Sequence, residues 1–354
     1  MLNRSMLLGM TVLGGLLAAT TLANAEAPTW VDGKLAPLAD GWPNQPLSLY
    51  VIDDPGTTDS IFATALSKAA EAKSPVSIRI EHRPDFSTYS TWEAQAWLIK
   101  QGEMADQGNW MIVYTAPGNI VDLIATDLKT EAGVDLSDIN YVNMVEELPY
   151  LINQRADAPW GDTLEDMIKY AKENPNTIRW IGGDPGAGQT AAMRYYMDKL
   201  GFTAKLIVGG NSGERALAVA SGDGDITVSP PDVLLPHYEG GKLEVLMVGG
   251  KTASPPWDKI PTAESLGITN DPWGTKRGLQ VVNAVPEDHR AWLEELFREA
   301  AKDPEFIANR KTVPGIGLQY FTGAEVKDMM NQAWDAALPI MQANGVYWKD
   351  NVKK

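Results

Sequence analysis

Residues 177–190 read TIRWIGGDPGAGQT, an apolar run that ends in a loop with four glycines. A helical pattern through Ala191, Tyr195 and Met197 follows, so the stretch predicts a strand, a glycine-rich turn and a helix. Such a turn exposes backbone N–H groups that have no partner within the helix, and the helix dipole adds positive potential at the same place. The stretch can therefore form an anion-binding loop at the carboxyl end of a strand.

From Gly183 onward the loop has the G-x-x-x-x-G-[K]-[ST] spacing of a nucleotide-binding P-loop, but Gln189 stands in place of the lysine. A P-loop uses that lysine and a bound magnesium ion to hold nucleotide phosphates. The backbone amides remain without the lysine, and they bind a carboxylate as readily as a phosphate. Two interpretations stay open at this point: a carboxylate-binding loop, and a plain strand-to-helix turn stiffened by Pro185.

Strands and helices alternate along most of the chain. Apolar runs predict strands near 47–51, 76–82, 110–115, 141–153, 177–182, 204–209, 225–229, 243–249 and 277–282. Three of these strands lead into further turns, which read DDPGTTDS at 53–60, APGN at 116–119 and GGNSG at 209–213. Since this alternation is typical of parallel sheets, we predict an α/β fold whose ligands lie at the carboxyl ends of strands.

Three helix starts carry recognisable caps. Asp59 or Ser60 is placed to cap the helix after the first of these turns. Thr163 is placed to begin a second helix, and Thr322 with Glu325 forms a capping box for the last long helix.

The first 25 residues have the features of a secretory signal. Arg4 precedes an apolar run over 6–19, and the small residues that follow end in Ala23-Asn24-Ala25. The run is shorter than the roughly 20 residues of a membrane-spanning helix. We therefore expect cleavage after Ala25 and release into the periplasm, with an uncleaved membrane anchor as the alternative.

The chain carries 46 acidic and 30 basic side chains, a formal net charge of −16 at pH 7, and no cysteine. A strongly acidic protein is a poor candidate for binding nucleic acid or an anionic membrane, because both are held through clustered lysine and arginine. The lack of cysteine excludes disulfides and thiolate metal sites. Residues 26–354 are too many for one core and fit two domains.

Motifs of the common enzyme classes are absent. The histidines are His82, His237 and His289, and their spacing is not that of a zinc site. GNSGE at 210–214 misses the G-x-S-x-G nucleophile motif at its last position. The Asp223-Gly-Asp225 turn lacks the other ligands of a calcium loop. We therefore expect no enzyme activity, no metal and no cofactor.

The domains are expected to be joined by strands that cross from one to the other. We expect a first lobe of residues 46–144 plus 252–354, which includes the C-terminal helices, and a second lobe of residues 145–251. The hinge is expected near 141–152 and 243–256, because no glycine- and serine-rich linker separates the two parts.

Six blocks of sequence carry a resemblance. They are PGTTD at 55–59, EHRP at 81–84, LEDMIKYAKENP at 164–175, GGDPGAGQT at 182–190, DKIPTAE at 258–264, and Trp273 with Arg277-Gly278. Together and in this order they resemble the periplasmic solute-binding receptors of tripartite tricarboxylate transporters. The first block is one residue shorter than that family's P-x-G-G-x-x-D loop and has one glycine replaced. His82 stands where the family has asparagine.

The resemblance implies a type II, Venus-flytrap periplasmic binding protein, in which each lobe is a mainly parallel sheet flanked by helices. It implies a monomeric receptor that binds an organic carboxylate between its lobes and delivers it to two membrane permease subunits of a secondary transporter. In the family, backbone amides and hydroxyls from loops of both lobes hold one carboxylate of the ligand. The ligand-binding residues that it implies are Gly56, Thr57, Thr58, Asp59, Thr115, Ala116 and Pro117 in the first lobe, and Gly186, Gly188, Gln189, Thr190, Gly210, Asn211, Ser212, Ser229 and Asp232 in the second.

Simpler alternatives stand beside these assignments. Asp59 can serve only as a helix cap, and the turn at 229–232 can be a plain strand exit. Arg83, Arg179 and Arg277 suit bidentate pairing with a carboxylate, yet most arginines are solvated or structural. Two alternatives to a transport receptor remain: a periplasmic sensor subunit with the same pocket, and a two-lobed enzyme. The residues do not identify the carboxylate, which can be aliphatic or aromatic.

Overall fold

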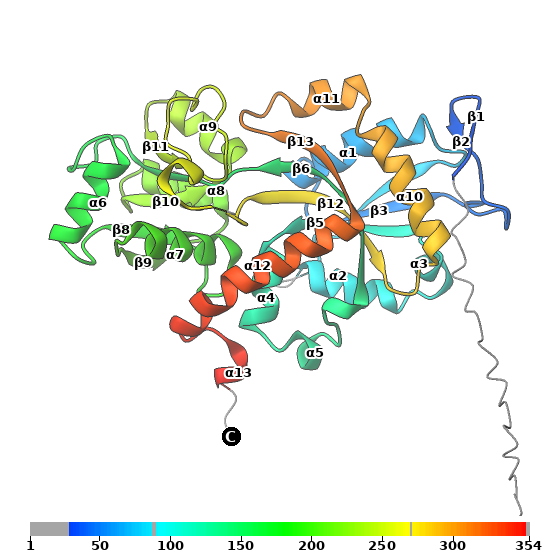
Figure 1. Ribbon diagram of the computed structural model, residues 1–354, viewed down its shortest axis with the longest axis horizontal. Coiled ribbons are helices and arrows are strands. Elements are labelled where there is room, and N and C mark those ends of the chain that lie inside the picture. The colour runs from blue at the N-terminus through cyan, green and yellow to red at the C-terminus, as the bar shows by residue number, and fades with distance from the viewer. Residues whose placement is uncertain (1–27, 87–89, 270, 352–354) are drawn as a thin grey trace, which may run out of the picture.

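The computed structural model describes residues 28–86, 90–269 and 271–351, which form two lobes, each built around its own sheet (Figure 1). The expected signal peptide, residues 1–25, lies outside the described residues. None of the helices in the described part is long and apolar enough to cross a membrane.

The first lobe holds a six-stranded sheet with helices on both faces. Its strands, in spatial order, are β13 (Gly317–Thr322), β6 (Ile139–Leu148), β12 (Thr275–Val282), β5 (Trp110–Ala116), β3 (Leu47–Val51) and β4 (Ile78–His82). Its helices are α1 (Thr58–Glu71), α2 (Ser90–Ile99), α3 (Glu103–Asp106), α4 (Gly118–Ala125), α5 (Leu128–Glu131), η1 (Leu136–Asp138), α10 (Glu287–Ala300), α11 (Pro304–Arg310), α12 (Gly323–Ala343) and α13 (Trp348–Asn351). A hairpin of β1 (Trp30–Val31) and β2 (Lys34–Leu35) lies beside this lobe (Figure 1).

The second lobe holds a five-stranded sheet. Its strands, in spatial order, are β11 (Leu243–Val248), β7 (Leu151–Arg155), β10 (Ile226–Ser229), β8 (Arg179–Gly182) and β9 (Lys205–Val208). Its helices are α6 (Leu164–Glu173), α7 (Gly188–Leu200), α8 (Ser212–Ala220) and α9 (Pro231–Glu239). One apolar core, with Met167 and Met193, packs α6 and α7 on one face, and a second, with Ala216 and Leu234, packs α8 and α9 on the other.

Both sheets are mixed, so the expectation of mainly parallel sheets holds only for part of each. In the first lobe β4, β3 and β5 pair in parallel, as do β9, β8 and β10 in the second. The remaining pairings are antiparallel: β12 and β7, which follow the crossings between lobes, each run against both of their neighbours, and β13 runs against β6. Each of the parallel strands is followed by a helix, and β3, β5, β8, β9 and β10 place the loops of the site.

Two crossings join the lobes side by side. β6 passes to β7 through Pro149-Tyr150, and β11 returns to β12 through residues 249–274, which include η2 (Glu264–Leu266). The crossings touch, since Gly249 N donates to Tyr150 O at 2.7 Å. Helix α12 adds a third link, because its Ala337 and Met341 are buried in the core of the second lobe. In Figure 1 it runs from the end of β13 toward α7.

The sequence-based elements are recovered with two corrections. The single strand expected over 141–153 is two strands, β6 and β7, that belong to different sheets. Thr57, rather than Asp59 or Ser60, caps α1, and its side chain accepts from Ser60 N. Strand β13 and helix α9 were not predicted.

Candidate ligand-binding cleft

Five strand-to-helix loops face one another between the lobes. β3–α1 and β5–α4 come from the first lobe, and β8–α7, β9–α8 and β10–α9 come from the second. The lobes touch at the helix starts, because a Cβ added at Gly188 would lie 2.6 Å from the Cα of Gly118. A Cβ at Gly186 would lie 2.9 Å from that of Ala125. Only glycine permits so close an approach, and the N-terminal ends of α4 and α7 therefore meet across the cleft.

A cavity of about 500 Å³ opens beside this contact. It is lined by Ile52, Asp53, Asp54, Asp59, Pro84, Phe86, Thr91, Thr115, Gly118, Asn119, Asp122, Ala187 and Gly188. Burial raises the pKa of Asp122 to about 7, because no positive group offsets the loss of solvation. The first-lobe wall is thus acidic, and the positive charge of the cleft lies elsewhere.

Arg277, 3% exposed, is the centre of a buried charge network. Its guanidinium pairs with Asp59 and Glu146, and its Nη2 donates to Thr58 Oγ1 at 2.8 Å. Asp232 of the second lobe lies 3.9 Å away. Burial lowers the pKa of Arg277, but the neighbouring carboxylates outweigh burial and raise it. Arg277 is therefore compensated within the protein and holds the α1 start in place.

Two partners complete this network. Arg310 Nε donates to Glu146 Oε2 at 2.7 Å, and Thr115 Oγ1 donates to Asp59 Oδ2 at 3.0 Å. Asp59 thus acts as an ion-pair partner and not as a helix cap. The pKa of Asp232 is raised by burial, against the opposing charge of Arg277.

Arg215, 7% exposed, lies in the second lobe with neutral partners. Its Nη1 donates to Gly210 O at 2.6 Å, and its Nη2 contacts Gln189 Oε1 and lies 3.1 Å from Ser212 Oγ. Burial lowers its pKa, against the smaller opposing effects of Tyr150 and Glu214. The sequence analysis did not single out Arg215, because its position in α8 carries no motif.

Hydroxyl groups without hydrogen-bond partners surround the same point. Thr190 and Ser229 are fully buried, and neither side-chain oxygen has a partner among the described residues. A Cβ at Gly183 would lie 3.1 Å from Arg215 Nη1 and 3.5 Å from Thr190 Oγ1. Ile226 of β10 pairs with Trp180 of β8 in parallel, and the same register continued by three residues sets Ser229 level with Gly183, one residue past the end of β8.

Other predicted residues lie away from the cleft, or their polar groups already have hydrogen-bond partners within the protein. Gly56 N donates to Ser60 Oγ, and Gly56 lines a cavity between α1 and α11. Asn211 caps α8 in a capping box with Glu214. Ala116 is buried in an apolar core, and Pro117 lines a cavity on the hinge side.

The other two arginines considered from sequence also have acidic partners. Arg83 pairs with Asp85 and lies over the ring of Phe86, 4.4 Å from its centroid. Arg179 binds Asp225 through its Nε and Nη2 atoms. Both are therefore structural pairs.

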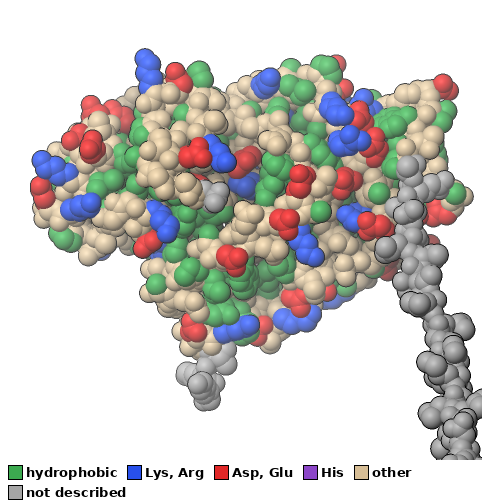
Figure 2. All heavy atoms as spheres, viewed as in Figure 1, with side chains coloured by type: hydrophobic (Ala, Val, Ile, Leu, Met, Phe, Trp, Pro, Cys, Tyr) green, Lys and Arg blue, Asp and Glu red, His purple; other side chains and the backbone are tan. Residues whose placement is uncertain are grey.

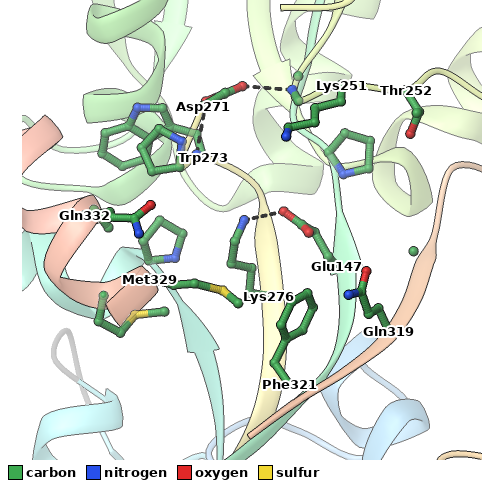
Figure 3. A pocket seen from close by; sticks show the side chains of 18 of the residues that line it. Glu147, Lys251, Thr252, Asp271, Trp273, Lys276, Gln319, Phe321, Met329 and Gln332 are labelled. Carbon is green, nitrogen blue, oxygen red and sulfur yellow. Dashed lines mark hydrogen bonds and ion pairs between the residues drawn. The ribbon is translucent and has the colours of Figure 1, made fainter. Parts of the chain in front are cut away.

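A second cavity, of about 540 Å³, lies between the crossings and α12. Figure 3 shows Lys276, in an ion pair with Glu147, and Lys251 pointing into the same space. Asp271 at its edge accepts from Gly250 N and Tyr196 Oη. Of the five cleft loops, only β5–α4 contributes to it, through Pro117. Figure 2 shows acidic and basic side chains interspersed over one face of the molecule.

The two lobes and their crossing strands have the architecture of periplasmic binding proteins. Among solved structures, a solute binding protein from Polaromonas superimposes with a TM-score of 0.69 at 20% identity, covering 85% of this chain and 99% of its own. MatC from Rhodopseudomonas palustris, solved with bound malate, gives 0.63 at 15% identity, covering 84% of this chain and 100% of its own. A second R. palustris protein, solved with adipate, gives 0.66 at 16% identity, covering 86% and 98%.

Residues 122–335 match the model of the tripartite tricarboxylate transporter family receptor. The chain belongs to this family, which confirms the resemblance seen in its sequence blocks. The family model describes a receptor and the Polaromonas protein is a solute binding protein, so the relationship is to binding proteins rather than to enzymes. No curated protein sequence matches the chain significantly.

Proposed function

We propose that this protein is an extracytoplasmic receptor that captures an organic carboxylate between its lobes and delivers it to a tripartite tricarboxylate-type secondary transporter. The observation that carries the proposal is the meeting of strand-to-helix loops from both lobes at Gly118 and Gly188. Free N–H groups at such helix starts bind anions. The malate and adipate in the two R. palustris structures support a carboxylate as the ligand.

The binding residues that we propose come from the strand-to-helix loops of both lobes. Thr58, Asp59 and Thr115 form the first-lobe side. In the second lobe the proposed residues are Gly186, Gly188, Gln189, Thr190, Ser212, Ser229 and Asp232. Since Asp59 is held by Arg277, it orients the first-lobe wall and does not repel the ligand as a free charge would.

The mechanism we propose is closure about a hinge at 141–152 and 243–256. Open lobes admit the ligand, and closure brings the two helix starts together around its carboxylate. Hydrogen bonds to a charged group contribute roughly 1.5–3 kcal/mol each. After the cost of ordering, several such bonds are consistent with a dissociation constant of about 1 μM.

The setting we propose is the periplasm, after cleavage of the signal peptide at Ala25. The closed form of a monomeric receptor then presents a joint surface of both lobes to two membrane permease subunits. An ion gradient would drive transport, so Gln189 in place of the P-loop lysine is no defect.

A thermal-shift screen of the purified protein tests this function. The panel contains aliphatic di- and tricarboxylates, aromatic acids and nucleotides, and calorimetry follows any hit. We expect stabilisation by a carboxylate, independent of magnesium, and none by ATP. A shift only with nucleotide and magnesium would identify residues 183–190 as a P-loop and overturn the proposal. Unchanged uptake after deletion of the gene would favour a sensor subunit instead.

A further inference from the structure

We infer that Arg215 is the side chain that pairs with the ligand's carboxylate, in a second-lobe subsite that it shares with Thr190, Ser229 and Tyr150. This inference rests on the proposed function and makes it more specific. It assigns charge recognition to one arginine of α8 rather than to backbone amides alone.

The first step is a comparison of the buried arginines in the described part of the chain, which are Arg215, Arg277 and Arg310. The last two share the carboxylate of Glu146, and Arg277 also binds Asp59. Arg215 forms no ion pair with a described acid, and its hydrogen bonds go to a carbonyl, an amide and a hydroxyl oxygen. Burying a charge without a counter-ion is costly. An anionic ligand would supply the missing counter-ion to Arg215, whereas Arg277 and Arg310 already have counter-ions within the protein.

The second step is the set of groups around the guanidinium. The hydroxyls of Thr190 and Ser229 are buried without partners near Gly183, beside Arg215. The Tyr150 hydroxyl lies close enough for the charge of Arg215 to act on its pKa. A cation among neutral donors, two of them unsatisfied, has the composition of an anion site.

The third step concerns Gln189, the residue that replaces the P-loop lysine. Its Oε1 atom contacts Arg215 Nη2 and accepts from Ser212 Oγ at 3.1 Å. A neutral amide oxygen therefore occupies the guanidinium position where a carboxylate oxygen would bind. A carboxylate forms the stronger, charge-assisted bond and displaces the amide. The planar guanidinium fork also matches a carboxylate geometrically, which a lysine ammonium does not.

Calorimetry on matched variants tests the inference. The probe is whichever of malate, adipate, succinate and benzoate gives the largest thermal shift with the wild-type protein, together with its carboxamide analogue. The variants are Arg215→Gln, Arg215→Lys and Arg298→Gln. The last removes the same charge from α10, where Arg298 pairs with Glu295 on the surface.

We expect Arg215→Gln to weaken binding of the carboxylate about 100-fold, Arg215→Lys to lie between, and Arg298→Gln to bind like wild type. The carboxamide should bind wild type and Arg215→Gln with similar, weak affinity, because an uncharged amide cannot form an ion pair with Arg215. The melting temperature of ligand-free Arg215→Gln should equal or exceed that of wild type, since a costly buried charge is gone.

The outcomes separate the two proposals. If no carboxylate binds the wild-type protein, the proposed function fails. If a carboxylate binds and Arg215→Gln binds it equally well, the function stands and the role of Arg215 is refuted. A lower melting temperature in ligand-free Arg215→Gln with unchanged affinity would show that Arg215 is structural.

Discussion

Replacing Gly188 by alanine should block closure of the lobes while leaving both lobes folded. The added Cβ would lie 2.6 Å from Gly118 Cα, whereas ordinary van der Waals contact begins at 3.4 Å. The loops must therefore separate by 0.8 Å or more, and such overpacking costs about 1–3 kcal/mol. Since the clash lies between lobes, opening relieves it. The cost should appear as a 5- to 150-fold weaker affinity for the carboxylate found in the screen.

Calorimetry and small-angle scattering together measure this effect. Wild type should become more compact on adding ligand, and Gly188→Ala should remain extended at the same ligand concentration. Its melting temperature without ligand should equal or exceed that of wild type, because opening relieves the clash and alanine is the better helix former at the start of α7.

Gly118→Ala is the matched control. Gly118 lies on the other side of the same contact, but a Cβ there meets no atom within 4 Å. It should bind and close as wild type does. Wild-type affinity and compaction in Gly188→Ala would refute the reasoning, because the two helix starts would then not meet in the bound form.

Three further predictions concern charge and capping. The pKa of Asp122 is about 7 in the fold, above its ordinary value, so its contribution to the free energy of unfolding should be lost as pH rises from about 4 to 7. Asp122→Asn should remove this pH dependence of the free energy of unfolding, measured by urea titration. Carboxylate binding should tighten below pH 7 in wild type only. Equal pH profiles in both proteins would contradict the raised pKa of Asp122. Arg277→Met should lower the free energy of unfolding by about 3–5 kcal/mol, because Glu146 and Asp59 lose a buried partner; a change below about 1 kcal/mol would show the network to be dispensable. Thr163→Ala should cost about 1 kcal/mol through loss of the α6 cap, with unchanged ligand affinity, and weaker binding would mean that α6 reaches the cleft.

Local patterns were sufficient for most elements of this fold. The apolar run and glycine loop at 177–190 became β8 and the start of α7, and the cap at Thr163 formed as expected. These features depend on residues within one turn of each other, so the sequence carries them directly. The positions of the strand-to-helix loops could be predicted from sequence for the same reason.

The roles of the charged side chains were decided by tertiary structure. Asp59 looks like a helix cap in sequence, yet it pairs with Arg277, which is 218 residues away. The expected strand over 141–153 divides because its two halves pair with different sheets. The ion pair has no local signal, whereas Pro149 marks the point at which the expected strand divides.

The sequence by itself therefore determined the α/β class, the strand-to-helix loops and the family, because periodicity, glycine and capping residues act over short distances. Only the tertiary structure decided which buried arginine pairs with carboxylates and which does not. Nothing in the sequence distinguishes Arg277 from Arg215. In the fold, carboxylates surround Arg277, whereas the hydrogen bonds of Arg215 go to neutral oxygens. Arg277 gains its acidic partners from β6 and α1, which are distant in sequence, whereas the partners of Arg215 lie in its own helix start and in α7, and electrostatic compensation depends on such distances.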